Sequence, residues 1–147
     1  MKEQTLDGAL SLAQFNVPLI APELLATDED GGPALRIGHC EACGRDAFPA
    51  PKVCSHCLSE TMSERALPGT GTLYSYSVVH AAPAHWNAPY ALGYVDLPDG
   101  LRILGQIQAP FDTIRIGERY RLDIGVVGRG ADGNPVSSYV FVREAVQ

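Results

Sequence analysis

The four cysteines of this chain fall into two Cys-x-x-Cys pairs, Cys40 with Cys43 and Cys54 with Cys57, and ten residues separate the pairs. A Cys-x-x-Cys turn places two sulfurs on one side of a tight loop, and two such turns that face each other form a tetrahedral zinc site. Gly44 directly follows the first pair, as expected where backbone amides must bend round to face the sulfurs. Because four thiolates leave no position for water, the sequence predicts one structural zinc ion, not a catalytic one.

The alternative chemistry for these cysteines is redox, as disulfides or as reactive thiol pairs. An isolated redox motif uses one pair and needs a thioredoxin-like βαβ context. We expect a cytoplasmic protein without a membrane span, because no apolar run approaches the ~18 residues that a spanning helix needs. Cysteines in that reducing compartment more often bind metal than form disulfides. His39 and His56, which flank the cysteines, are predicted to lie beside the metal ligands without binding the ion.

Two further histidines, His80 and His85, lie at and beyond the end of a predicted strand, next to Trp86. A general acid or base could be formed there. No Ser, Cys or carboxylate partner stands within sequence reach, so a loop that packs on a partner protein is the favoured interpretation. Tyr90 begins the next strand, and aromatic residues such as Trp86 and Tyr90 are typical interface anchors.

Tyr74 and Tyr76 are predicted to share one strand face, where they could stack on nucleic-acid bases. Few basic residues interleave with them, so packing or protein contact is favoured. A modest phosphate site is the alternative to a solvated strand face for the arginines of the second half: Arg102, Arg115, Arg119, Arg121 and Arg129. A formal net charge of -6 opposes nucleic-acid binding, which depends on basic residues that neutralise phosphates. No phosphate-binding loop or nucleophile motif is present, so the chain alone is predicted to be no enzyme.

The elements that must position the cysteines are short. Residues 34–39 are predicted to form a strand that leads into the first cysteine pair, and residues 47–50 the return strand to the second. Before them, Leu6, Leu10, Leu12 and Phe15 could form a weak helical face, and residues 22–26 are predicted to form a short helix with Pro22 near its start. Residues 28–33 break any helix and are predicted to form an exposed loop.

From Gly69 onward the pattern becomes β. Alternating polar and apolar residues predict strands at 72–80, 90–97, 101–108, 119–127 and 137–143, with a hairpin turn at 98–100 and a long loop at 81–89. Five strands in this length suit an OB-fold barrel, and another small antiparallel barrel or sandwich is the runner-up. We therefore predict a mainly β protein: an N-terminal helical or extended segment (1–33), a rubredoxin-like zinc ribbon (34–66) and an OB barrel (67–147).

The chain resembles a family of proteins that join a zinc ribbon to an OB fold and are associated with acyl-CoA metabolism. The resemblance covers residues 34–143. It rests on Cys40-Glu-Ala-Cys43-Gly44, Phe48-Pro49, Cys54-Ser-His-Cys57 and Gly69-Thr-Gly71, followed by Pro89-Tyr90 and Gly100-Leu-Arg-Ile-Leu-Gly105. The ordered combination is specific, whereas the ribbon alone would not be.

The resemblance implies a non-catalytic subunit of a thiolase-type acyl-CoA enzyme, which helps to assemble or cover the CoA site, in some members during breakdown of aromatic acyl-CoAs. Acyl-CoA hydratase or aldolase complexes are the alternative partners, and a single-stranded nucleic-acid module is the alternative outside this class. A CoA thioester could lie at the interface with the catalytic subunit. Residues predicted to contact the partner or CoA are Phe48, Tyr74, Tyr76, His80, His85, Trp86, Tyr90 and Arg102.

Overall fold

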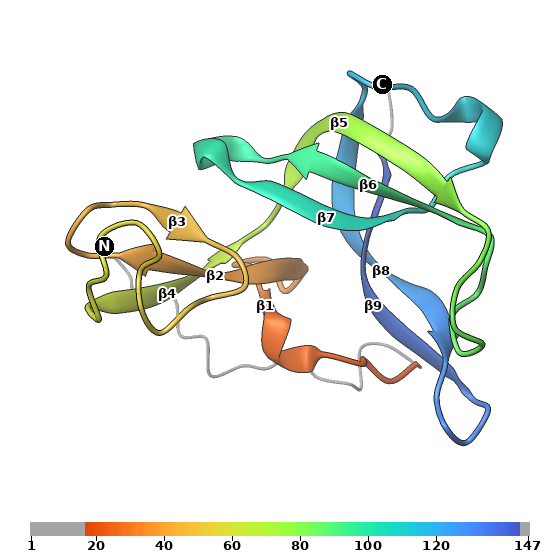
Figure 1. Ribbon diagram of the computed structural model, residues 1–147, viewed down its shortest axis with the longest axis horizontal. Helices are drawn as coiled ribbons and strands as arrows, with labels where there is room; N and C mark the ends of the chain where they lie inside the picture. Colours follow the sequence, from red (N-terminus) through yellow and green to blue (C-terminus); the bar gives the residue numbers. More distant parts are fainter. Residues whose placement is uncertain (1–16, 145–147) are drawn as a thin grey trace.

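A computed structural model describes residues 17–144, which form a small β-sheet next to a β-barrel (Figure 1). The small sheet contains β1 (Leu25–Thr27), β2 (Pro33–Cys40), β3 (Asp46–Ala47) and β4 (Met62–Leu67). The barrel contains β5 (Thr70–Val79), β6 (Tyr90–Asp96), β7 (Arg102–Ile107), β8 (Arg119–Arg129) and β9 (Pro135–Arg143). Single 3-10 turns at Pro22–Leu24, Pro98–Gly100 and Phe111–Thr113 are the helical elements of this part of the chain. None of its helices is long and apolar enough to cross a membrane.

Strand β2 is the centre of the small sheet. Leu35 pairs with Leu25 of β1 on one edge and with Leu67 of β4 on the other, and Gly38 pairs with Ala47 of β3 on the same edge as β1. All of these pairings are antiparallel. The sheet therefore carries Cys40, the last residue of β2, at the end of a strand that is fixed on both sides.

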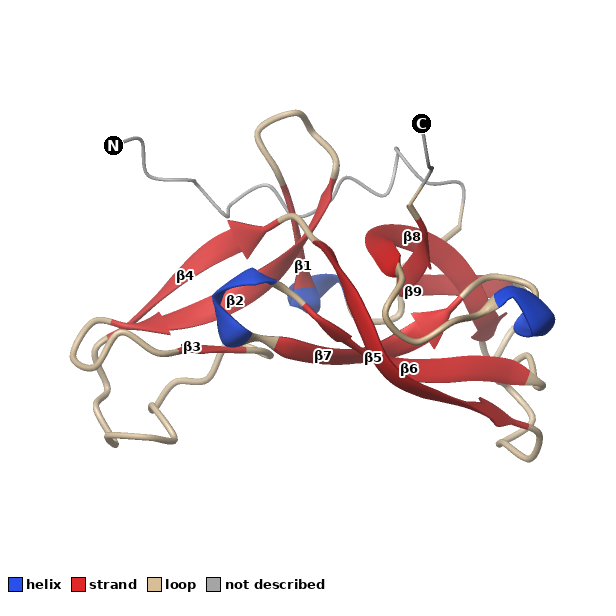
Figure 2. Ribbon diagram, turned by 90° about the horizontal axis from the view of Figure 1, so that it is seen from above, coloured by secondary structure: helices blue, strands red, loops and turns tan. Residues whose placement is uncertain are grey.

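The barrel closes in the order β5-β6-β7-β9-β8, with β8 returning to β5 (Figures 1 and 2). Strands β7 and β9 run parallel, and the other neighbours run antiparallel. The five predicted strands and the closed barrel are confirmed, and the sandwich alternative is wrong. Bulges interrupt β5 between Leu73 and Ser75 and β8 between Val126 and Gly128.

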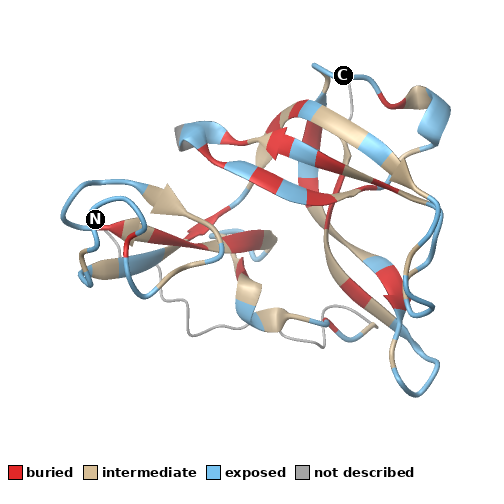
Figure 3. Cartoon of the chain, viewed as in Figure 1, coloured by how far each residue is buried: buried red, intermediate tan, exposed pale blue. Residues whose placement is uncertain are grey.

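The two sheets share one hydrophobic core. Leu25, Leu35 and Ile37 of the small sheet belong to the same buried cluster as Tyr120 and Phe141 of the barrel. Figure 3 shows buried residues on β2 as well as on the barrel strands. The ribbon is too small to bury a core of its own, so β2 is stabilised by packing against the barrel as well as by its metal site.

The N-terminal prediction is only partly met. Residues 22–26 were expected to form a short helix, but a single 3-10 turn ends at Leu24, and Leu25 and Ala26 lie in β1 instead. Both side chains are buried against β2, and this pairing outweighs the local preference for a helix after Pro22. The helical face predicted for Leu6, Leu10, Leu12 and Phe15 lies outside the described residues.

Two strands of the ribbon also differ from expectation. The return strand predicted at 47–50 shrinks to the two residues of β3, because Pro49 lacks the N–H that a longer ladder would use. Strand β4 was not predicted at all. It pairs with β2 over six residues, and it leads the chain from the ribbon into the barrel.

Candidate functional site

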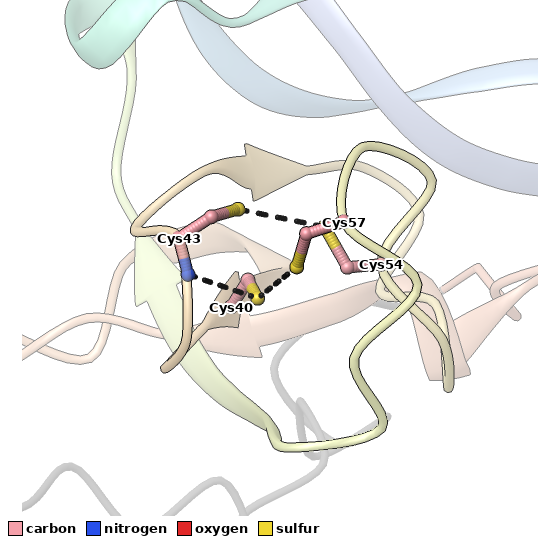
Figure 4. Close-up of side chains that lie close together, drawn as sticks. All are labelled: Cys40, Cys43, Cys54 and Cys57. Atoms are coloured by element: carbon pink, nitrogen blue, oxygen red, sulfur yellow. Dashed lines mark hydrogen bonds between the residues drawn. The ribbon is translucent and has the colours of Figure 1, made fainter.

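The four cysteine sulfurs converge at the end of β2 (Figure 4). The sulfurs of Cys40 and Cys57 are 3.5 Å apart, those of Cys43 and Cys54 are 3.7 Å apart, and all four lie within 4.8 Å of one another. A zinc ion with Zn–S bonds of ~2.3 Å would place its tetrahedral ligands ~3.8 Å apart. The sulfurs therefore fit one zinc ion, and their number and type match a closed structural site.

The two cysteine turns are held by similar backbone hydrogen bonds. The N–H of Cys43 donates to the Cys40 sulfur (3.5 Å), and the N–H of His56 donates to the Cys54 sulfur (3.4 Å). Each turn then closes with a hydrogen bond to the carbonyl of its first cysteine, from Gly44 in one turn (2.8 Å) and from Leu58 in the other (2.9 Å). Both of these closing residues have positive φ angles, +81° and +65°.

Leu58 is the one of the two that carries a side chain in this left-handed conformation, so replacing it with glycine is expected to stabilise the protein. The left-handed region costs a non-glycine residue ~1–2 kcal/mol, partly offset by the greater chain entropy of glycine. The Leu58 side chain is 75% exposed, so little packing is lost. We expect Leu58→Gly to raise the free energy of unfolding by about 0.5–1 kcal/mol in urea titrations. Leu58→Ala retains the Cβ atom and is expected to give no such gain. A loss of stability in the glycine variant would contradict this explanation.

Without a metal ion, the four thiols do not ionise equally. The Cys43 N–H lowers the pKa of Cys40 to about 6. A backbone hydrogen bond from Ser59 also lowers the pKa of Cys57, but the adjacent Cys40 sulfur and burial raise it, and it stands at about 12. Four thiolates at these distances repel one another, so zinc must supply positive charge and displace protons as it binds.

A polar cluster of His39, Asp46 and Arg65 connects β2, the strand that carries Cys40, to β3 and β4. The Asp46 carboxylate accepts hydrogen bonds from His39 Nδ1 (2.7 Å) and from the Arg65 guanidinium (2.7 Å). Burial raises the pKa of Asp46, but these two partners outweigh it and lower the pKa below its usual value. His39 thus lies beside the metal site without entering it, and neither His39 nor His56 joins the metal-binding group found among residues 17–144.

Phe48 lies between the cysteine pairs and contacts the barrel. Its ring meets the Tyr139 ring edge to face, with 5.7 Å between centroids. Tyr139 in turn donates from its hydroxyl to the Leu104 carbonyl (2.7 Å), and burial raises the pKa of its phenol. The half-buried Phe48 therefore joins ribbon to barrel within this chain, and a partner contact for it stays a prediction.

Tyr74 and Tyr76 do not share a strand face, contrary to the sequence prediction. The bulge between Leu73 and Ser75 inserts one residue and breaks the alternation. Tyr76 packs against the core, whereas Tyr74 is 51% exposed. The Tyr74 ring centroid lies 3.5 Å from the Cζ atom of Arg102, so the guanidinium stacks on the ring. Arg102 Nε also forms an ion pair with Asp96 Oδ1, at 2.6 Å. Arg102 is thus paired on both sides.

The 81–89 loop is fixed to the barrel. Trp86 forms an isolated bridge with Gly128, and the His85 carbonyl accepts from the Arg129 N–H (2.8 Å). The His85 ring lies 5.3 Å from the Trp86 ring, centroid to centroid. His80 and His85 are both exposed, and neither imidazole has a hydrogen-bond partner in the described part of the chain. The loop brings His85 and Trp86 together, and within residues 17–144 neither histidine has an acid or base partner.

Trp86 and Tyr90 line a shallow hollow of about 270 Å³ that also includes residues the sequence analysis missed. These are Ile20, Leu92, Leu104, Gly105, Gln106, Val127, Ser138 and Tyr139. The sequence does contain a signal for this hollow, because residues 90–95 carry no charged or strongly polar side chain on either face of the strand. Such a strand is expected to be packed on its outer face as well as on its inner face. Among residues 17–144, none of the side chains that line this hollow is charged.

Comparisons with known proteins match this architecture. Residues 33–63 match the profile of the "ChsH2, rubredoxin-like zinc ribbon domain", and residues 64–124 match the "ChsH2, C-terminal OB-fold domain". The chain is 32% identical over 145 residues to "Benzoylsuccinyl-CoA thiolase subunit BbsA" of Geobacter metallireducens, an alignment that covers 98% of this chain and 99% of that protein. The subunit of the same name from Thauera aromatica is 34% identical over 127 residues, 86% of this chain and 88% of the relative.

The solved structure of an "Ltp2-ChsH2(DUF35) aldolase" contains a chain that superposes with a TM-score of 0.60 at 30% identity, over 75% of this chain and 84% of that one. The cysteine tetrad, the closed barrel and the near-complete alignments agree with one another. This chain therefore belongs to the ChsH2-type family, in which a rubredoxin-like zinc ribbon precedes a C-terminal OB-fold domain.

Proposed function

We propose that this chain is a non-catalytic, zinc-binding accessory subunit of a thiolase-type acyl-CoA enzyme, in which it helps to assemble or cover the CoA and substrate site. The observation that carries the proposal is the alignment over 98% of this chain with a protein named as a subunit of benzoylsuccinyl-CoA thiolase. Aromatic acyl-CoAs are accordingly the substrate class that we propose for the complex.

The chemistry of the chain supports an accessory role. Four sulfur ligands fill the zinc coordination shell, so the ion has no position at which to bind a substrate. The barrel also offers little to a nucleic acid, because three of the five arginines that were candidates for a phosphate site are paired with carboxylates. These pairs are Arg102 with Asp96, Arg119 with Glu144 and Arg121 with Asp123.

An aldolase complex is the second candidate. It is supported by the structural similarity to the "Ltp2-ChsH2(DUF35) aldolase". Thiolases and aldolases both act at the carbon–carbon bond of an acyl-CoA, but only thiolysis consumes free CoA. The two candidates are therefore separable in one assay, and a hydratase partner stays a prediction that the same assay tests.

The proposal is tested by reconstitution. The chain is purified alone and with candidate catalytic subunits from the same organism: a thiolase, an acyl-CoA aldolase and an enoyl-CoA hydratase. We expect a stable complex with the thiolase, and cleavage of an aromatic 3-oxoacyl-CoA only when the chain, the thiolase and free CoA are all present. Cleavage without CoA by an aldolase complex would favour the second candidate. Turnover by the chain alone, or no complex with any of the three, would overturn the proposal.

A further inference from the structure

The outer face of β6 and β7 carries an apolar surface that continues onto the 81–89 loop. Tyr94 pairs with Leu104, and Leu92 pairs with Gln106. Leu104 and Tyr94 are 43% and 42% exposed. With Trp86 and Ile20 at its rim, this surface surrounds the hollow described above. We call it the Trp86 face: Ile20, Trp86, Tyr90, Leu92, Tyr94 and Leu104.

The rims of the Trp86 face are held in place before any partner binds. On one side, Asn87 donates to the Val127 carbonyl (3.2 Å), next to the bridge that holds Trp86. On the other side, the Ile20 N–H donates to the Ser137 carbonyl (2.9 Å), and the Ser137 N–H donates to the Pro18 carbonyl (2.7 Å). A preformed surface loses little conformational entropy on association, which favours tight binding.

The ribbon supports the floor of the same face. Tyr139 lines the hollow, donates to the Leu104 carbonyl and is backed by Phe48. Phe48 belongs to the excursion between the cysteine pairs. Gly38 of β2 lets that excursion lie close, because a Cβ atom there would be 2.8 Å from Pro51 Cδ and 3.2 Å from Ala50 Cα. The metal site thus holds the loop that supports the Trp86 face.

The size and chemistry of the hollow indicate what covers it. About 270 Å³ is below the ~300–1,000 Å³ of typical small-molecule sites, so a protein side chain fits better than an acyl-CoA. Three other hollows of the described chain each contain both acidic and basic residues, whereas this one contains neither. A second copy is disfavoured, since each chain carries a net charge of -6 and like-charged copies repel.

We infer that the Trp86 face is the docking site for an uncharged, apolar segment of the catalytic subunit, with one large side chain anchored between Trp86 and Leu104. This inference rests on the proposed function. Because the contact lacks charges, its affinity should change less than about threefold between 0.05 and 0.5 M NaCl, whereas nucleic-acid binding would fall by orders of magnitude.

The test is calorimetric titration of the catalytic subunit into the wild-type chain and into Leu104→Glu, which places a charge in the hollow. We expect the Kd to rise at least about 30-fold, as for loss of an interface hot spot. Ile116→Glu is the matched control, because Ile116 is 63% exposed and lies outside the face. It should change the Kd less than about threefold. Zinc content and the thermal unfolding transition confirm that both variants are folded.

The outcomes separate the two proposals. If the wild type binds and Leu104→Glu binds equally well, the docking site is wrong and the accessory role stands. If the wild type binds no catalytic subunit, both the accessory role and the docking site are wrong. Sedimentation that shows a dimer of this chain, split by Leu104→Glu, would assign the face to a second copy and overturn the inference.

Discussion

Replacing Cys40 with serine is expected to release the zinc ion and to lower the free energy of unfolding by at least ~3 kcal/mol. Cys40 has no exposed surface and ends the strand that carries Leu35 and Ile37 into the shared core. A serine hydroxyl is a poor zinc ligand, and the three remaining thiolates would lose the cation that offsets their repulsion. Loss of the metal site therefore also destabilises the barrel, because β2 contributes to the shared core.

Metal analysis and thermal unfolding measure this effect. We expect less than one zinc per ten chains and a fall in Tm of about 6–12 °C. His56→Ala is the control, because His56 is exposed and only its backbone N–H, which alanine retains, binds the Cys54 sulfur. It should keep one zinc per chain. A Cys40→Ser protein that retained full zinc and an unchanged Tm would refute the metal site.

The metal site was predictable from sequence because its determinants are local. Each Cys-x-x-Cys turn is set by contacts within five residues, such as the bond from Gly44 to the Cys40 carbonyl. The barrel strands were predictable for a similar reason, since alternation along one strand reports which face is buried. The 98–100 turn also forms where the Asp-Gly pair predicted it, as the 3-10 turn Pro98–Gly100 between β6 and β7.

The features that escaped prediction depend on contacts between distant segments. Leu25 and Ala26 become a strand only because β2 lies beside them. Tyr74 and Tyr76 separate because of a bulge whose position depends on pairing with β6. The support of Tyr139 by Phe48 joins residues more than ninety positions apart. No local pattern encodes such a contact, so the Trp86 face emerges only in the folded chain.

Replacing Gly128 with alanine is expected to detach the 85–87 segment from the barrel. An added Cβ atom would overlap the His85 carbonyl oxygen and would lie 3.3 Å from the Trp86 Cα. Both are backbone atoms, so no flexible side chain can move aside. The segment would lose the hydrogen bonds between Arg129 and His85 and between Asn87 and Val127. Together with overpacking, this should cost about 2–3 kcal/mol of unfolding free energy.

Trp86 is the single tryptophan of the chain, so its fluorescence reports this change directly. We expect Gly128→Ala to shift the emission to longer wavelength and to increase quenching by iodide, while the zinc content stays at one ion per chain. Gly130→Ala is the matched control: its Cβ would lie 3.2 Å from Asp132 Oδ1, the end of an exposed side chain that needs to move only slightly. Identical spectra and stabilities for the two variants would show that the loop is not held at Gly128. The predicted result instead separates the two supports of the Trp86 face, because Gly128→Ala removes its rim and leaves the metal intact, whereas Cys40→Ser removes the metal first.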